Sequence, residues 1–239
     1  MGAELARRFA TGKVEVRSFR LAAPAGMAKH SSMRLLLGLL ALLAWLVTTA
    51  SHAGKPASEQ APKPEAYLLV PEPRAMRSST SKVLADARGT VFSPAHTTGG
   101  TLKVYSAAEF AKLGLGWETF RERAEAAAER LLAVHTPELI KDEEGHVQYA
   151  VYRGDEEVIA CMLLAPSLGQ IFKKVFGEEV WLVCPDRHSL YIFPPKAEAM
   201  ADFADDLRQR YQDAAFAASE EVFLRKNGTP LQAIGSLPK

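Results

Sequence analysis

The chain has 239 residues, of which 48% are hydrophobic and 24% charged, as is ordinary for a globular protein that can bury a core. Removing the seven basic and two acidic side chains of residues 1–53 from the totals of 29 and 28 leaves 22 basic and 26 acidic ones, a net charge of −4. A mildly acidic domain without a basic stripe lacks the charge needed to bind a nucleic-acid backbone or an anionic membrane surface.

An uncharged apolar run at residues 35–47 (LLLGLLALLAWLV) follows Arg34 and ends in small and polar residues. This pattern is typical of a secretory signal peptide, which has a basic segment, a short apolar segment and a cleavage region of small residues. Ser51 and Ala53 fit the small-x-small pattern that signal peptidase requires, so we expect cleavage after Ala53, with Ala50 as the alternative. A membrane anchor is the other interpretation, but a spanning helix needs about 20 apolar residues.

The predicted organisation has three parts. Residues 1–53 form the signal peptide with an over-long N-terminal leader, because Met33 or Met27 would each give a conventional start. Residues 54–65 are rich in Pro, Lys and Ser and predict a flexible linker. We expect a single domain over residues 66–239.

The first part of this domain has few regular patterns. Residues 66–70 (AYLLV) predict an edge strand that Pro71 ends. Residues 71–100 are rich in turn-forming Pro and Gly and predict irregular structure with at most a short strand. Residues 101–105 (TLKVY) alternate weakly in polarity and predict another strand.

Two helices are expected next. Ser106 and Glu109 have the spacing of a capping box, at the start of a short helix that Gly114 can end. Residues 117–134 predict a long helix whose charged face is solvated. Its core-facing stripe consists of apolar residues three and four positions apart: Trp117, Phe120, Ala124, Ala127, Leu131 and Val134.

The middle of the domain predicts a hairpin and a third helix. Residues 147–152 are rich in strand formers, and the continuous apolar run at 158–164 (VIACMLL) fits a central strand buried on both faces. Gly154-Asp155 supplies the turn between them. Ser167 can cap the next helix and Gly177 can end it. Its apolar stripe is Leu168, Ile171, Phe172, Val175 and Phe176.

Two more hairpins and a helix complete the chain. Residues 180–184 and 189–193 predict strands that flank a four-residue turn. Pro195 suits the first turn of the last helix. Residues 220–234 predict a final hairpin with a primed turn at Asn227-Gly228. Because the strands arrive in hairpins, the pattern predicts the α+β class: an antiparallel sheet built from hairpins with helices packed on one side, after a cleaved signal peptide.

Three segments carry a resemblance to a known family. Leu115-Gly-Trp-Glu118, the apolar run at 159–164 and residues 180–188 (VWLVCPDRH) resemble the YtpQ-like bacterial family of uncharacterised domains, over residues 115–239. In that family a hydrophobic strand runs into Pro-Ser-Arg-Asp. Here Pro185 and Arg187 match, and the other two positions differ. The resemblance implies a small α+β domain and carries no activity.

The turn Pro185-Asp186-Arg187-His188 is the polar cluster that most resembles a functional site in the sequence. As a site, Arg187 would bind an anion and Asp186 and His188 would transfer protons. As a hairpin turn, the same residue types are explained by backbone chemistry alone.

Cys161 and Cys184 are the only cysteines. Export would allow a disulfide between them, because both lie in predicted strands that could be adjacent. They can equally be two buried thiols that act as small hydrophobes. A third interpretation, a nucleophilic Cys184 with His188 as its base, requires an orienting group that the spacing does not secure.

No cofactor or metal is expected. The histidines at 96, 135, 146 and 188 have no metal-ligand spacing, and no phosphate-binding glycine motif occurs. We therefore expect an exported protein, periplasmic or secreted, with a non-catalytic domain that binds a protein or peptide partner. The alternative is a hydrolase that uses the turn formed by Asp186, Arg187 and His188.

Overall fold

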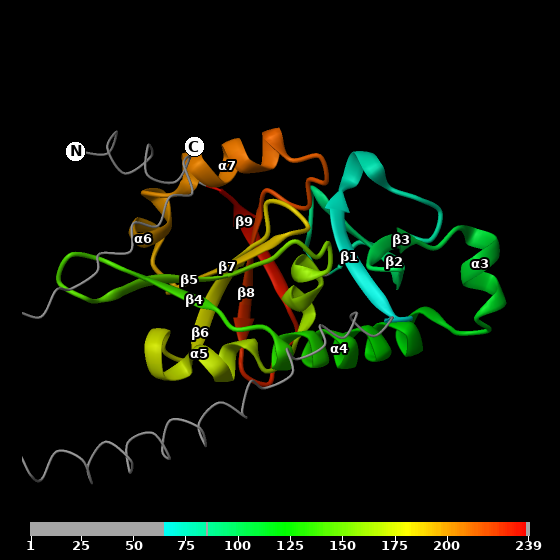
Figure 1. Ribbon diagram of the computed structural model, residues 1–239, viewed down its shortest axis with the longest axis horizontal. Coiled ribbons are helices and arrows are strands. Elements are labelled where there is room, and N and C mark those ends of the chain that lie inside the picture. The colour runs from blue at the N-terminus through cyan, green and yellow to red at the C-terminus, as the bar shows by residue number, and fades with distance from the viewer. Residues whose placement is uncertain (1–64, 85, 238–239) are drawn as a thin grey trace, which may run out of the picture. The chain divides into compact units, whose positions relative to one another are not determined.

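The structure of the protein is a computed structural model that describes residues 65–84 and 86–237 (Figure 1). These residues lie in one compact unit, Glu59–Lys239. The predicted signal peptide, its cleavage site at Ala53 and all but the last residue of the predicted linker lie outside the described residues. None of the helices within the described ranges is long and apolar enough to cross a membrane.

A three-stranded antiparallel sheet forms the first part of the unit, in the order β1-β2-β3. Its strands are β1 (Leu68–Pro73), β2 (Thr90–Thr98) and β3 (Thr101–Val104), and a short 3-10 helix, η1 (Arg74–Met76), follows β1. The edge position of β1 and the strand at β3 are confirmed. The irregular structure expected over residues 71–100 is wrong, because β2 is a nine-residue central strand.

The prolines do not end these strands, because each lies where its missing N–H costs little. Pro71 lies opposite Phe92 in the pairing of β1 and β2. The amide and carbonyl of Phe92 form their hydrogen bonds with Lys82, on the other side of β2, so no partner in β2 requires an N–H from Pro71. Pro94 accepts a hydrogen bond from the Tyr105 amide at 2.8 Å, and the Tyr105 carbonyl, which would bond an N–H at position 94, accepts the Thr80 hydroxyl at 3.2 Å instead. Proline is tolerated in sheets at such positions.

A six-stranded antiparallel sheet forms the rest, in the order β4-β5-β7-β6-β8-β9. The strands are β4 (Glu138–Lys141), β5 (Val147–Arg153), β6 (Glu179–Val183), β7 (Ser189–Phe193), β8 (Glu221–Lys226) and β9 (Gln232–Ser236). The predicted β6–β7 and β8–β9 hairpins are confirmed. The primed turn at Asn227-Gly228 is wrong, since φ is positive at Gly228 (+74°) but not at Asn227.

The apolar run at 158–164 is not a strand. It forms the 3-10 helix η2 (Ile159–Leu164), in which every residue is buried. Strand β5, its expected hairpin partner, pairs instead with β4 and β7. A segment surrounded by apolar neighbours on all sides has no polar face, so its sequence carries no periodicity that separates helix from strand.

Helices cover both faces of the six-stranded sheet, which corrects the expectation of helices on one side. Along β7, Leu190 and Ile192 face the large core shared with η2, α4 (Trp117–Val134) and α5 (Leu168–Phe176). Tyr191 and Phe193 face a second core with Met200 and Leu207, on α6 (Ala197–Ala201) and α7 (Ala204–Asp213). Figure 1 shows α6 and α7 on one side of this sheet and α4 and α5 on the other. The α+β class is confirmed.

The helices follow the sequence pattern with several differences. The predicted cap at Ser167 is wrong, because its side chain makes no capping hydrogen bond at the start of α5 and donates to Glu129 instead. The capping box at Ser106 is present at the start of α3 (Ala107–Lys112), and α4 has the predicted bounds. The last helix is interrupted and becomes α6 and α7. Val134 is 76% exposed, so the stripe of α4 ends before it. On α5, Ile171 and Val175 are also exposed, so only part of the predicted stripe is buried.

Candidate functional site

Asp186 is held by the fold rather than presented to solvent. Its side chain is buried in the turn between β6 and β7, where Oδ1 accepts the His188 amide at 2.8 Å and the Ser189 hydroxyl at 3.0 Å. Oδ2 accepts Nε of Arg210, from α7. Both oxygens of this carboxylate are therefore occupied by groups of the protein itself. Asp186 therefore fixes the turn and anchors α7.

Arg187 points away from the other two residues of the predicted site. Its guanidinium donates to Glu72 of β1 at 2.7 Å and to Glu157 at 3.3 Å. It also lies over the Phe216 ring, with 5.0 Å from Cζ to the ring centroid. Two carboxylates already neutralise this cation, so an anionic ligand would have to displace them.

His188 lies at the surface beside Asp186 but is not coupled to it as a catalytic pair. The carboxylate of Asp186 bonds the backbone amide of His188 rather than its imidazole. A base that acts in catalysis is oriented by a hydrogen bond to its ring. The structure therefore brings Asp186 and His188 together, directs Arg187 elsewhere and does not form the predicted catalytic arrangement.

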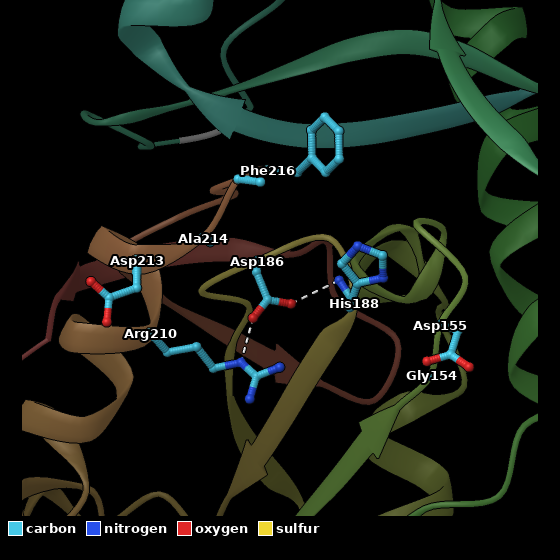
Figure 2. A pocket seen from close by; sticks show the side chains of 9 residues that line it. Gly154, Asp155, Asp186, His188, Arg210, Asp213, Ala214 and Phe216 are labelled. Carbon is cyan, nitrogen blue, oxygen red and sulfur yellow. Dashed lines mark hydrogen bonds and ion pairs between the residues drawn. The ribbon is translucent and has the colours of Figure 1, made fainter. Parts of the chain in front are cut away.

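An open hollow of about 650 Å³ lies on the solvent side of this turn (Figure 2). The turn contributes Asp186 and His188, and the loop after β5 contributes Gly154 and Asp155. The end of α7 and the segment after it contribute Arg210, Asp213, Ala214, Ala215 and Phe216. Figure 2 shows Asp213 and Asp155 at opposite ends of the view, with the Asp186–Arg210 pair between them.

Some charged groups of the hollow form ion pairs with each other, and others do not. Burial lowers the pKa of the Arg210 guanidinium, but Tyr191 and Asp186 outweigh this effect and the pKa is raised overall. Arg210 is therefore a cation that Asp186 already neutralises. Asp155 and Asp213 are exposed carboxylates without an ion-pair partner among the described residues. The hollow thus carries a net negative charge at its rim.

The two cysteines are free thiols, and both are buried. Burial raises the pKa of Cys161 to about 12 and also raises the pKa of Cys184. A thiol that stays protonated is neither a nucleophile nor a metal ligand. Cys184 is not among the residues that line the hollow with His188, so the geometry gives the Cys184–His188 interpretation no support.

The four histidines of the domain lie in separate surroundings. His96 packs against the Tyr105 ring, His135 faces Glu156 at 3.6 Å and His146 faces Asp142 at 3.4 Å. Over the described residues, no three His, Cys, Asp or Glu side chains gather in a way that could hold a metal ion.

Sequence reasoning missed most residues of the hollow. The sequence pattern indicates Asp155 only as part of a turn, and it gives no role to Arg210, Asp213 or Phe216. One local signal was present, because Asp213 ends a helix, where the helix dipole disfavours a negative charge. Its proximity to the β6–β7 turn depends on the tertiary fold.

Comparison of the chain with protein-family models, with curated proteins and with solved structures gives no match. The resemblance to the YtpQ-like family therefore stays a prediction.

Proposed function

We propose that this chain is an exported protein, periplasmic or secreted, whose domain binds a protein or peptide partner without catalysing a reaction. The observation that carries this proposal is that the charged groups of the hollow are either paired with each other or exposed to solvent. Its interior ionic groups, Asp186 and Arg210, satisfy each other. Its rim groups, Asp155, Asp213 and the 45% exposed Phe216, face solvent. A catalytic site needs reactive groups that are free to act on a substrate, and this ion pair leaves neither Asp186 nor Arg210 free.

The alternative, a hydrolase centred on Asp186, Arg187 and His188, receives less support. Hydrolysis needs a base within reach of a nucleophile and a donor for the developing negative charge. The Arg187 guanidinium is already bound by Glu72 and Glu157, and Asp186 is bound by Arg210. These bonds give Asp186 and Arg187 structural roles.

Export is supported by the sequence of residues 35–53, with its basic flank, apolar run and small-residue exit. The test is the intact mass of the protein recovered from the envelope and the medium of the producing cell. We expect a mass that begins at Gly54. A precursor found only in membranes would refute export with cleavage.

Binding is tested by a photo-cross-linking amino acid introduced at Ala215, which is exposed in the hollow. The matched control places it at Glu122, on the exposed face of α4. In the producing cell we expect one defined protein adduct from position 215 and none from position 122. Absence of an adduct at 215, or the same adducts at both positions, would refute a partner at this surface.

A further inference from the structure

We propose that Asn227 is a site of spontaneous deamidation, in which the backbone nitrogen of Gly228 attacks the Asn227 side chain and the amide becomes a carboxylate. This inference goes beyond the proposed binding function and does not depend on it. It follows from the accessible amide of Gly228 and from the positive surroundings of the Asn227 side chain. Asn227 is the only asparagine in the chain.

The first step is access for the attacking atom. Asn227 and Gly228 are the central residues of the turn between β8 and β9, in which the Thr229 amide donates to the Lys226 carbonyl at 3.2 Å. Gly228 is exposed, and a Cβ added to it would meet no heavy atom within 4 Å apart from its chain neighbours. Its amide forms no hydrogen bond with another described residue. A glycine nitrogen that no side chain shields is free to approach Cγ of Asn227.

The reaction consumes only water. Hydroxide removes the proton of the Gly228 amide, and the nitrogen forms a bond to Cγ of Asn227 while the bond from Cγ to Nδ2 breaks. The Nδ2 group takes a proton from water, which restores the hydroxide, and leaves as ammonia. Water then opens the five-membered succinimide ring at one of its two carbonyl carbons. The product is aspartate or isoaspartate, in which the backbone runs through the side chain.

The second step is the orientation of the Asn227 amide. A Cβ added at Gly169, the second residue of α5, would lie 3.1 Å from Oδ1 of Asn227, so this oxygen packs against the first turn of the helix. The Gln170 side chain accepts the Nδ2 amide at 2.9 Å. During the attack, negative charge develops on Oδ1. The N-terminal end of a helix dipole is positive and stabilises such a charge.

The third step is the charge of Arg225, whose Cγ would lie 3.6 Å from the same added Cβ at Gly169. Arg225 is 4% exposed, and its guanidinium donates only to the carbonyl oxygens of Thr229 at 3.3 Å and Leu163 at 3.2 Å. Its Nε atom has no hydrogen-bond partner within the described part of the chain. A buried cation that no carboxylate contacts is unfavourable. A carboxylate at position 227 would therefore be stabilised by both Arg225 and the helix dipole.

The test incubates the folded protein and a synthetic peptide of residues 222–233 side by side at mildly alkaline pH. Mass spectrometry follows the exchange of ammonia for water, which reports on Asn227 because the chain has no other asparagine and glutamine reacts more slowly through a larger ring. We expect the protein to convert at a rate within about tenfold of the peptide, and faster at higher pH. An isoaspartyl methyltransferase should label the product, because direct hydrolysis of the amide yields aspartate alone.

Two variants sharpen the test. N227Q cannot close the five-membered ring and should stay unconverted over the same period. N227D has the aspartate product from the start and should unfold at a higher temperature than the wild type. The inference would be overturned by a folded protein that keeps its amide after the peptide has converted, by conversion without isoaspartate, or by N227D that unfolds at a lower temperature than the wild type.

Discussion

The Nη2 atom of Arg187 donates to Oε1 of Glu72 at 2.7 Å, and this ion pair joins the turn between β6 and β7 to strand β1 of the other sheet. Both side chains are largely buried, with 12% and 7% of their surfaces exposed. Glu157, from the loop before η2, is the second acceptor at 3.3 Å. The turn that the sequence marks as a candidate site is thus a junction between the two sheets.

Replacing Arg187 with Met should destabilise the fold by about 3 kcal/mol, because removing one partner of a buried pair leaves its carboxylates without a counter-charge. The matched control is R121M on α4, whose ion pairs with Glu118 and Glu125 are exposed and should contribute less than about 1 kcal/mol. Urea unfolding of both variants measures the difference. Equal losses of stability would contradict the structural role given to Arg187.

The Glu129 side chain of α4 fixes the start of α5. Its carboxylate accepts the Ser167 amide at 2.6 Å and the Ser167 hydroxyl at 2.5 Å. E129A should therefore cost about 2 kcal/mol of unfolding free energy, as expected for loss of a charged acceptor at a helix N-terminus. E122A, on the exposed face of the same helix, should change stability by less than about 0.5 kcal/mol. A similar effect of both substitutions would rule out this capping role.

Elements with local signals were predictable. The capping box at Ser106 and Glu109 gives the start of α3, because both of its hydrogen bonds join residues three positions apart. The apolar stripe gives the bounds of α4, because a helix that is half exposed shows its period in the sequence. The β6–β7 hairpin follows from two strand-forming runs that flank turn residues.

Features set by distant contacts were not predictable. Arg187 finds Glu72 across 115 positions of sequence, and nothing near either residue marks the other as its partner. The central strand β2 contains Pro94, and the Tyr105 carbonyl, which an N–H at position 94 would bond, accepts the Thr80 hydroxyl from a distant part of the chain. The hollow likewise depends on α7 lying over the β6–β7 turn, where Arg210 meets Asp186.

Both thiols should be unreactive in the folded protein. Cys161 and Cys184 are buried, and burial raises the pKa of each. We expect no modification by a thiol reagent near neutral pH under native conditions, and modification of both thiols once urea unfolds the chain. The protein must be purified from the producing cell without reductant. Thiols that appear only after reductant is added to the unfolded chain would establish the Cys161–Cys184 disulfide and contradict the free-thiol state.

Stability should decline at alkaline pH, and one conservative substitution should make the decline shallower. Burial raises the pKa of the Tyr152 hydroxyl from 10.0 to about 12 and that of Cys161 from 9.0 to about 12. In the unfolded chain both groups lose their protons at their ordinary values, so the folded state holds more protons from about pH 9 upward. The stability that these groups contribute is fully present below pH 9 and is lost as the pH rises toward 12.

Each such group adds a slope of roughly 1.4 kcal/mol per pH unit between its two pKa values. Y152F keeps the ring that packs edge-on against Phe172 and removes the titrating hydroxyl. We expect Y152F to match wild type within about 1 kcal/mol at pH 7 and to lose less stability between pH 10 and 12. The measurement is urea unfolding across this range. Parallel curves for the two proteins would mean that the Tyr152 hydroxyl ionises as readily in the folded chain as in the unfolded one.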